Sequence, residues 1–450
     1  TLRSANGRYE VTWDSPYDEV EQDIIVTDLV SGKEIASVSY SAFDGRSGAF
    51  GQVPFLIDDE GEFLYVHEVC DFDIDTYDVN KQILNEIKSW KMGDEIIDLY
   101  YFLAVIKMAI DDSKLAITDK SKNEIGLILA HENMGYDQFY WKIINELSFI
   151  NKNNISRPVT KKDFLEYFYT KFQRTGYELQ SFMSLHHIAK MFDIHGYSLI
   201  VNNACASGLY ALEVAADAIK TKKCKQMIVA AVDHSSIFKH MWFKNINMCA
   251  RDGKIKPFAL DRDGFTLGDG GAALVLESMD SAIKRGANIY AEYMGGSFTL
   301  EGWKVTYPDV ANDFYSRVIL KALSIANMKS KDIDLLVPHG VGTNITDSYE
   351  AKAITDIFGK EANKPKITAL KPYIGHTLGS TAILEMAIML IGLKKRKVPP
   401  TLNCEKLDTA LGIDLIRNMA YASDIKIAMK TACGFAGFNA ACIFKKIDKN

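Results

Sequence analysis

One unit of strand, loop and helix occurs twice in this chain, and it constrains the fold more than any other feature. Ser198–Val201 is an apolar strand followed by a loop and by a helix rich in small residues, Ser207–Lys220. Ile367–Leu370 begins a second such unit, which ends in the helix Ser380–Leu393. Successive units of this kind place helices on the faces of a mainly parallel sheet. The pattern therefore predicts a duplicated α/β fold with a join near Ser278–Ala291.

The region before these units changes character along its length. A helical stretch over Tyr77–Ile117 leads to a buried strand, Ile125–Ala130, from which helices and strands alternate. Residues 1–80 instead contain short β-like stretches separated by Asp and Gly turns: Tyr9–Thr12, Ile24–Leu29, Ile35–Tyr40 and Phe63–His67. We expect this first segment to be ordered and to pack on the sheet or at a dimer interface.

Composition excludes several classes of protein. With 48% hydrophobic and 24% charged residues, the 450-residue chain is typical of a globular protein. Its net charge of −6 lacks the basic excess of nucleic-acid binders, and no apolar run is long enough to span a membrane. The seven cysteines form no CxxC pair, so neither a disulfide framework nor a metal site is indicated, and we expect a cytoplasmic protein.

Cys205 stands where the first repeated unit turns from strand into helix. A thiol at a helix N-terminus feels the positive end of the helix dipole, which favours the thiolate. The small neighbours Ala204, Ala206 and Gly208 leave space for a substrate carbonyl. A nucleophile is one interpretation of this cysteine, and a buried residue that only fills space is the other.

Two histidines stand at comparable turns later in the chain. His339 follows the apolar stretch Leu335–Pro338, and the carboxyl ends of strands are where α/β folds bind ligands. His376 follows the second repeated strand, with Lys371 shortly before it. Each alone can be an ordinary loop histidine. Together with Cys205, they suggest a cysteine nucleophile served by two imidazoles.

Three neighbouring patterns have structural interpretations. Asp347 and Glu350 have the spacing of a capping box for a helix over Ser348–Phe358. The glycine-rich run Asp261–Gly271 lacks the phosphate-loop pattern and precedes an apolar strand, so a hairpin is the better interpretation. The turn Gly434–Asn439 can point backbone amides at an oxyanion.

Taken together, these blocks resemble the β-ketoacyl synthase family of the thiolase superfamily, the condensing enzymes of fatty-acid and polyketide assembly. The similarity covers about residues 120–447. The blocks that carry it follow the family's order: Asn203–Ser207, Pro257–Phe258, Arg262–Gly271, Pro308–Asp309 through Asp332–Asp334, His339–Thr343, Lys371–Gly379 and Gly434–Asn439.

The resemblance implies the thiolase fold, in which two βαβαβαββ halves form a five-layer α-β-α-β-α sandwich. Residues 1–285 would be the N-terminal half with the nucleophile, and residues 286–450 the C-terminal half with both histidines. The family's glycine-rich opening strand has no recognisable counterpart here, and Ile24–Val30 is a distant candidate. Residues 1–80 are thus an atypical, β-rich start.

The implied reaction is a decarboxylative Claisen condensation in fatty-acid or type II polyketide-like biosynthesis. An acyl chain held on Cys205 would join malonyl-ACP to give 3-oxoacyl-ACP. His339 and His376 would assist decarboxylation, and Lys371 would balance the charge of the site. Backbone amides of Cys205 and Phe435 would form the oxyanion hole, with Phe435 also gating the acyl pocket. Three carboxylates support these residues in the family: Glu385, Asp347 and Glu350.

The family binds no cofactor of its own, and its 4′-phosphopantetheine arrives on the acyl carrier protein, here toward Thr343. Val341 and Asp269 replace a threonine and a glutamate that are usual in the family. The implied assembly is a dimer, either a homodimer or a heterodimer with a second ketosynthase-like subunit. Lys394–Lys397 and Lys220–Lys223 are two candidate docking patches for an acidic carrier, and the sequence does not choose between them.

Two other functions stay open at this stage. A non-catalytic partner subunit that resembles a chain-length factor would lack the nucleophile, which the presence of Cys205 argues against. Initiating synthases carry asparagine in place of His376, and thiolases use a second cysteine, for which Cys433 is the nearest position. Acyl chain length, extender unit and product class are not fixed by the sequence.

Overall fold

The computed structural model describes residues 97–132, 161–162, 180–359, 364–422 and 424–447, together with six short strands between Leu2 and Tyr65. Of the expected helical stretch, residues 77–96 lie outside the described part. No helix in the described ranges combines the length and the apolar character that crossing a bilayer requires.

The C-terminal half is a complete βαβαβαββ unit. Its elements are β11 (Ala291–Leu300), α10 (Phe314–Ile325), β12 (Leu335–Val337), α11 (Asn344–Phe358), β13 (Lys366–Ile367), α13 (Thr381–Lys395), β16 (Ile427–Cys433) and β17 (Phe438–Lys446). Two short helices, α12 (Lys371–Ile374) and η2 (Leu378–Ser380), precede α13. The sheet has the order β11-β17-β16-β12-β13, in which β12 is parallel to both neighbours and β17 antiparallel to both.

In the described residues, the N-terminal half follows the same path, and no counterpart of the first strand is among them. Its elements are α2 (Ile97–Ser113), β7 (Ile125–Ala130), α6 (Ser181–Phe192), β8 (Ser198–Val201), α7 (Ser207–Lys220), β9 (Gln226–Asp233) and β10 (Gly270–Glu277), with α8 (Ile237–Asn245) between the last two strands. The sheet order β10-β9-β7-β8 matches β17-β16-β12-β13 of the other half. The short helix α9 (Met279–Lys284) leads from one half to the other.

The strand β11 has no counterpart among the described residues of the N-terminal half. Within the described ranges, no strand pairs with the outer edge of β10, and a cavity of about 770 Å³ runs along it between α2, α7 and β11. The distant candidate for this strand, Ile24–Val30, overlaps β3 (Gln22–Asp28). Because β3 pairs with β2 and β4 and not with β10, that candidate is wrong.

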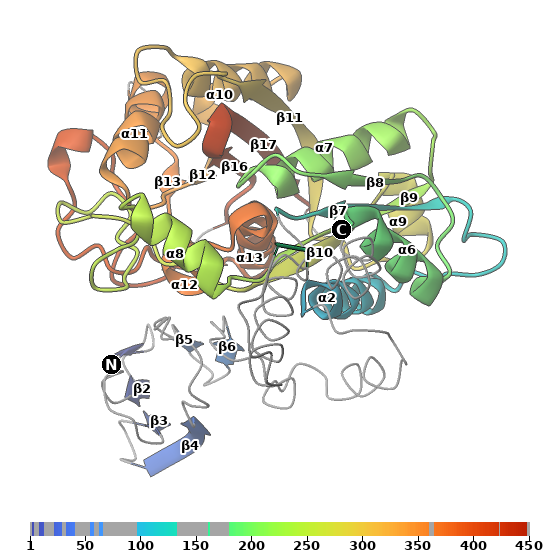
Figure 1. Ribbon diagram of the computed structural model, residues 1–450, viewed down its shortest axis with the longest axis horizontal. Helices are drawn as coiled ribbons and strands as arrows, with labels where there is room; N and C mark the ends of the chain where they lie inside the picture. The colour runs from blue at the N-terminus through green and yellow to red at the C-terminus, as the bar shows by residue number, and fades with distance from the viewer. Residues whose placement is uncertain are drawn as a thin grey trace.

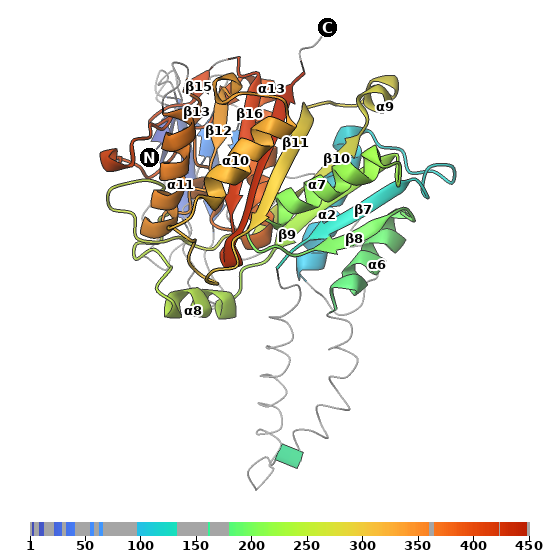
Figure 2. The same ribbon diagram turned by 90° about the horizontal axis from the view of Figure 1, so that it is seen from above.

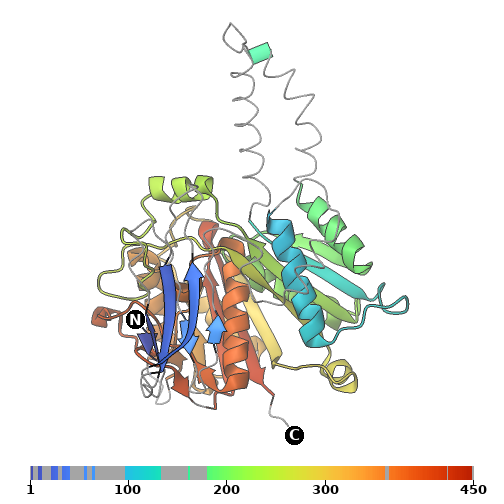
Figure 3. The ribbon, with the colours of Figure 1, turned by 90° about the horizontal axis from the view of Figure 1, so that it is seen from below.

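The N-terminal strands form two small sheets (Figure 3). One has the order β1-β2-β3-β4, and the other pairs β5 with β6. The remaining bounds are β1 (Leu2–Arg3), β2 (Tyr9–Thr12), β4 (Lys33–Tyr40), β5 (Phe55–Ile57) and β6 (Phe63–Tyr65). All four expected stretches are therefore strands, and β1 and β5 were not expected. Their packing at an interface stays a prediction.

Five layers result from the two halves (Figures 1 and 2). Helices α2 and α6 pack on the outer face of the N-terminal sheet, where they bury one hydrophobic cluster. Helices α10 and α11 cover the C-terminal sheet in the same way. Between the sheets, α7 and α13 share a third cluster with both of them. This is the predicted thiolase-type sandwich.

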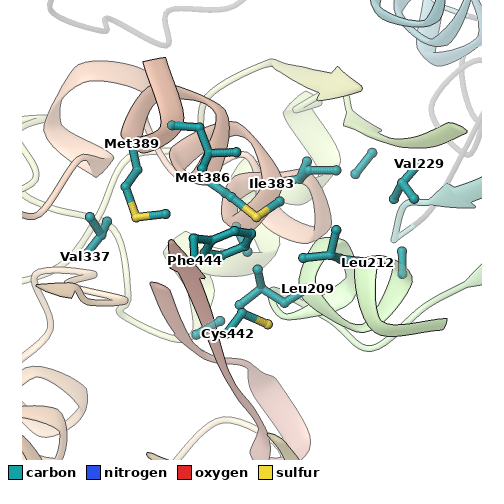
Figure 4. Close-up of a cluster of buried hydrophobic side chains, with 14 of the residues drawn as sticks. Leu209, Leu212, Val229, Val337, Ile383, Met386, Met389, Cys442 and Phe444 are labelled. Atoms are coloured by element: carbon teal, nitrogen blue, oxygen red, sulfur yellow. The ribbon is translucent and has the colours of Figure 1, made fainter. Parts of the chain in front are cut away.

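The central layer brings the two repeated units into contact. Leu209 of α7 and Ile383 and Met386 of α13 face one another, with Phe444 of β17 beside them (Figure 4). A Cβ at Gly208 would lie only 2.8 Å from the Cβ of Ile383, so glycine is required where the helices approach. The two helices therefore start side by side, and the loops that precede them meet.

Candidate active site

Cys205 lies in a tight turn before α7 and is 5% exposed. The turn places Ala204 at a φ of 50°, a left-handed conformation that is costly for a residue with a Cβ. Ser207 holds this turn, because its hydroxyl accepts from the Asn203 amide at 2.8 Å and donates to the Ala204 carbonyl at 2.6 Å. The sulfur is thus fixed where the sequence placed it, between strand and helix.

A second turn brings another amide to the same sulfur. It is η4 (Phe435–Gly437), and the backbone N–H groups of Phe435 and Cys205, acting as donors toward the sulfur, both lower the pKa of the Cys205 thiol. A Cβ at Gly434 would lie 3.2 Å from the Cys205 amide nitrogen, so glycine lets the two turns abut. Two amides aimed at one point are the geometry of an oxyanion hole.

The electrostatics of the sulfur differ from the expectation that a helix start alone favours the thiolate. Burial raises the pKa of the Cys205 thiol well above its ordinary value, and the Glu132 carboxylate adds to this rise. Lys371 and the two amides act in the opposite direction and do not offset it. The resting form is therefore the thiol.

His339 and His376 face each other beside Cys205. Both are buried, and their rings meet edge to face with centroids 5.6 Å apart. Lys371 Nζ donates to the His339 carbonyl at 2.6 Å and lies 3.3 Å from His339 Nδ1. Because an ammonium only donates, His339 Nδ1 must accept, and the ring proton is carried on Nε2.

His376 is held by the glycine-rich run. Its amide donates to the Thr266 carbonyl at 2.8 Å, and the Gly268 amide donates to the His376 carbonyl at 3.2 Å. Its Nδ1 lies 2.9 Å from Thr381 Oγ1, and the Phe265 ring packs on it with centroids 5.0 Å apart. The run 261–271 is therefore not the hairpin that was expected: it makes parallel bridges to Cys249 and His376 before it enters β10, and so it positions a histidine.

Both imidazoles are neutral at ordinary pH. Burial, and after it the positive charge of Lys371, lowers the pKa of each ring well below its usual value. Lys430 lowers the pKa of both rings further. A neutral imidazole keeps one N–H, so each ring can donate one hydrogen bond without bringing in a charge.

Lys430 is the functional residue that sequence reasoning missed. Its Nζ lies 2.6 Å from Glu385 Oε2, and Lys371 Nζ lies 3.3 Å from Glu385 Oε1, with all three side chains fully buried. Lys430 also donates to the Pro338 carbonyl at 3.0 Å, immediately before His339. The available signal was a lysine inside the apolar strand Ile427–Cys433.

The capping-box interpretation of Asp347 and Glu350 is wrong. Helix α11 begins at Asn344 rather than Ser348, and both carboxylates reach back to the loop that carries His339. Glu350 accepts from the His339 amide at 2.6 Å, and Asp347 accepts from the Gly342 amide at 3.0 Å. They fix the loop that presents the imidazole.

A pocket leads from the surface to the Cys205 sulfur. Its inner wall includes both imidazoles and Phe435, and its outer part is formed by residues 305–308 and by Thr343. The Thr343 hydroxyl oxygen is buried there and has no hydrogen-bond partner. Val341 also lines the pocket but belongs to an apolar cluster, so it supplies no second hydroxyl.

Other positions singled out from the sequence lie beside or away from this centre. Cys433 is buried and lines the pocket, and both it and Cys205 are free thiols. Asp269 accepts from the Ser235 amide and so ties β10 to the segment after β9. No group of three metal-ligating side chains lies close enough to hold a metal ion in the described ranges.

Comparison with known proteins decides the family. The family models "Beta-ketoacyl synthase, N-terminal domain" and "Beta-ketoacyl synthase, C-terminal domain" match residues 98–282 and 290–405. The chain belongs to the β-ketoacyl synthase family.

Curated relatives in this β-ketoacyl synthase family include 3-oxoacyl-[acyl-carrier-protein] synthase 2 of Staphylococcus aureus strain COL. It is 38% identical over 193 residues, which cover 43% of this chain and 47% of the relative. The enzyme of the same name from Mycobacterium bovis is 34% identical over 192 residues, covering 43% of this chain and 46% of the relative. The chain thus spans about half the length of the curated relatives it matches.

Solved structures of ketosynthases have the same fold. The ishigamide ketosynthase/chain length factor has a TM-score of 0.69 at 25% identity, covering 78% of this chain and 82% of that one. A type II polyketide ketosynthase in complex with its acyl-carrier protein has a TM-score of 0.69 at 25% identity, covering 80% and 87%.

Proposed function

We propose that the protein is a decarboxylating ketosynthase, an acyltransferase of the 3-oxoacyl-[acyl-carrier-protein] synthase type. It would join an acyl chain held on Cys205 to malonyl-ACP. The observation that carries this proposal is the convergence of one buried thiol, two amides and two neutral imidazoles on a single pocket. Fatty-acid and polyketide products are both compatible with it.

In the first half-reaction, Cys205 attacks the thioester of the incoming acyl group. The new sulfur–carbon bond forms while the thioester oxygen becomes an oxyanion, which the amides of Cys205 and Phe435 stabilise. The oxyanion collapses, the bond to the pantetheine sulfur breaks, and the thiol proton leaves with that sulfur. The acyl chain stays on Cys205.

In the second half-reaction, the malonyl group loses carbon dioxide. The electron pair of the breaking bond moves into an enolate, whose oxygen accepts hydrogen bonds from His339 and His376. The enolate carbon then attacks the acyl carbon on Cys205, and the same two amides hold the tetrahedral oxyanion. Its collapse releases the Cys205 thiolate and a 3-oxoacyl product on the carrier. Lys371, with Glu385 and Lys430, keeps both rings neutral throughout.

The carrier's phosphopantetheine arm is the proposed occupant of the outer pocket. The unpartnered Thr343 hydroxyl suits an amide of that arm, because a buried hydroxyl without a partner is costly. At the outer mouth of the pocket, Val305 (65%) and Tyr307 (43%) expose apolar side chains, and so does Trp242 (47%), whose ring contacts Phe435. A carrier protein that docks here would cover them.

The two lysine patches stay predictions for the docking site. Helices α7 and α13 have 14 and 15 residues, so each spans about 21 to 22 Å. Lys220–Lys223 and Lys394–Lys397 stand at the ends of these helices, and the pocket at their beginnings. This separation favours the apolar mouth over either patch.

We further propose a dimer, a division of the chain into residues 1–285 and 286–450, and a location in the cytoplasm. Support for the dimer comes from β8, which in the described part of the chain pairs on one side only, because an exposed strand edge is a ready site for pairing. Helix α9, between the last strand of one sheet and the first of the other, supports the division.

The alternative, a non-catalytic partner subunit, fits less well. Such a subunit has no use for a thiol that two amides and two imidazoles surround. The test is intact mass after incubation with acyl-carrier thioesters. We expect one acyl adduct on the parent, none on Cys205→Ala, and an unchanged adduct on the control Cys224→Ala. An adduct that persists in Cys205→Ala would refute the assignment.

A further inference from the structure

Glu132 approaches the Cys205 sulfur from outside the lining of the substrate pocket. Its Oε1 lies 4.0 Å from Sγ, while Glu132 does not line the pocket through which pantetheine would enter. The residue lies two positions after the end of the buried strand β7. A charged side chain just after a buried strand could have marked Glu132 as a candidate site residue, and the sequence analysis overlooked it.

The backbone and stem of Glu132 are fixed. Its amide donates to Asp233 Oδ1 at 3.0 Å, and its carbonyl accepts from Asn202 Nδ2 at 2.9 Å. A Cβ at Gly379 would lie 3.3 Å from Glu132 Cγ, so the stem packs against the loop that follows His376. The carboxyl group is therefore held beside the sulfur rather than free to swing into solvent.

The proposed function needs two separate spaces around Cys205. The acyl chain occupies the sulfur when the extender's pantetheine arm enters through the pocket, so the acyl chain must lie on the other side. Glu132 stands beside the sulfur and outside the lining of that pocket, where it would meet such a chain. A long alkyl chain would have to pass the carboxyl group and displace it.

The surroundings of Glu132 are polar as well. Asp233 accepts from the Ser380 amide at 3.1 Å, and Lys239 Nζ lies 3.9 Å from Asp233 Oδ1. The His131 ring is 2% exposed, and neither of its nitrogens has a hydrogen-bond partner. An alkyl chain gains little from entering such a space, because its burial is favourable only among apolar groups.

We propose that Glu132 determines which acyl groups Cys205 accepts: it excludes long unsubstituted alkyl chains and favours short acyl groups with a hydroxyl on carbon 3. At 4.0 Å from the sulfur, the carboxylate is within reach of a donor on the third carbon of a bound acyl group. This inference rests on the proposed function, since it assigns a specificity to the acylation of Cys205.

The test measures rates of Cys205 acylation by intact mass, with butyryl-, 3-hydroxybutyryl- and decanoyl-pantetheine and no carrier protein. For the parent we expect 3-hydroxybutyryl to react at least tenfold faster than butyryl, and decanoyl at least 100-fold slower than butyryl. Glu132→Ala should lose the hydroxyl preference and raise the decanoyl rate at least tenfold. Glu132→Gln keeps size and an acceptor, so it should keep both the exclusion and a weaker preference.

The matched control is Glu213→Ala, which removes another partly buried carboxylate. Glu213 lies on α7, the helix that follows Cys205, and accepts from the Tyr293 hydroxyl. It should leave all three rates unchanged. Equal rates for butyryl and decanoyl in the parent, or an unchanged profile in a folded Glu132→Ala, would overturn the specificity while leaving the proposed function intact. No adduct from any thioester on the parent would overturn both.

Discussion

Replacing Lys430 with methionine tests whether the buried charge cluster sustains the active site. Lys430, Glu385 and Lys371 form a chain of charges with no exposed side chain, in which one carboxylate serves two ammonium groups. Met fills a similar volume but leaves Glu385 with Lys371 alone, 3.3 Å away. Breaking a buried ion pair from one side costs about 3 to 5 kcal/mol.

The cost should be in this range because Lys430 has more than one partner. Besides Glu385, it donates to the carbonyls of Pro338 at 3.0 Å and Thr431 at 2.9 Å, and both lose their donor. The substitution also removes a cost. Burial lowers the pKa of Lys430 and so disfavours its charged form, and methionine has no charge to bury. We therefore expect a loss of about 3 kcal/mol in the free energy of unfolding.

The activity should fall for a separate reason. The Pro338 carbonyl directly precedes His339, so its movement would displace the imidazole. A misplacement of about 1 Å can cost 100-fold in rate. We expect decarboxylation to fall at least tenfold, while acylation of Cys205 changes little.

The assays are urea unfolding and carbon dioxide release from malonyl-carrier. Lys446→Met is the matched control, because Lys446 is 8% exposed on a neighbouring strand but pairs with Asp424, which is 46% exposed. Such a surface pair contributes about 0 to 1 kcal/mol. If Lys430→Met unfolded and decarboxylated like this control, the charge cluster would have no role in the site.

Three further predictions follow from single contacts. Burial raises the pKa of Glu132 to about 7. The carboxylate that forms above that pH disfavours the Cys205 thiolate. The rate of Cys205 alkylation by iodoacetamide should therefore level off with rising pH in the parent but keep rising in Glu132→Gln. Coincident pH profiles would refute the coupling. Thr343→Val removes the unpartnered hydroxyl of the outer pocket, and should raise KM for malonyl-carrier about tenfold with kcat unchanged; a change in kcat alone would contradict this role. Gly434→Ala places a Cβ 3.2 Å from the Cys205 amide nitrogen and should slow acylation about 100-fold, as measured by adduct mass; a parent-like rate would mean that this amide does not serve the oxyanion.

Local sequence patterns identified the elements that carry the site. Strand and helix bounds at Ile125–Ala130, Ser198–Val201 and Ser207–Lys220 agree with the structure, because burial and small residues leave a clear periodic signal there. The turn around Cys205 could be placed for the same reason, since the chain must reverse between a buried strand and a buried helix.

Contacts between distant segments could not be predicted from the same patterns. Lys430 meets Glu385 across two elements, and Glu132 reaches Cys205 from another strand. The sequence spacing of Asp347 and Glu350 favours a capping box within one helix. In the structure both carboxylates instead bond to the loop that carries His339. The family resemblance implied only that these two residues support the site, and it offered nothing for Glu132.

The most direct test of the central claim is a parallel measurement of acylation and decarboxylation in His339→Ala and His376→Ala. Two amides hold the acylation oxyanion, whereas the imidazoles hold the enolate oxygen. We therefore predict that both variants still form the acyl adduct on Cys205, while carbon dioxide release from malonyl-carrier falls about 10²–10³-fold. His240→Ala, which removes an imidazole bonded to the Ser236 carbonyl, is the control and should release carbon dioxide like the parent. A parent-like rate of release in either His339→Ala or His376→Ala would contradict the two-imidazole mechanism.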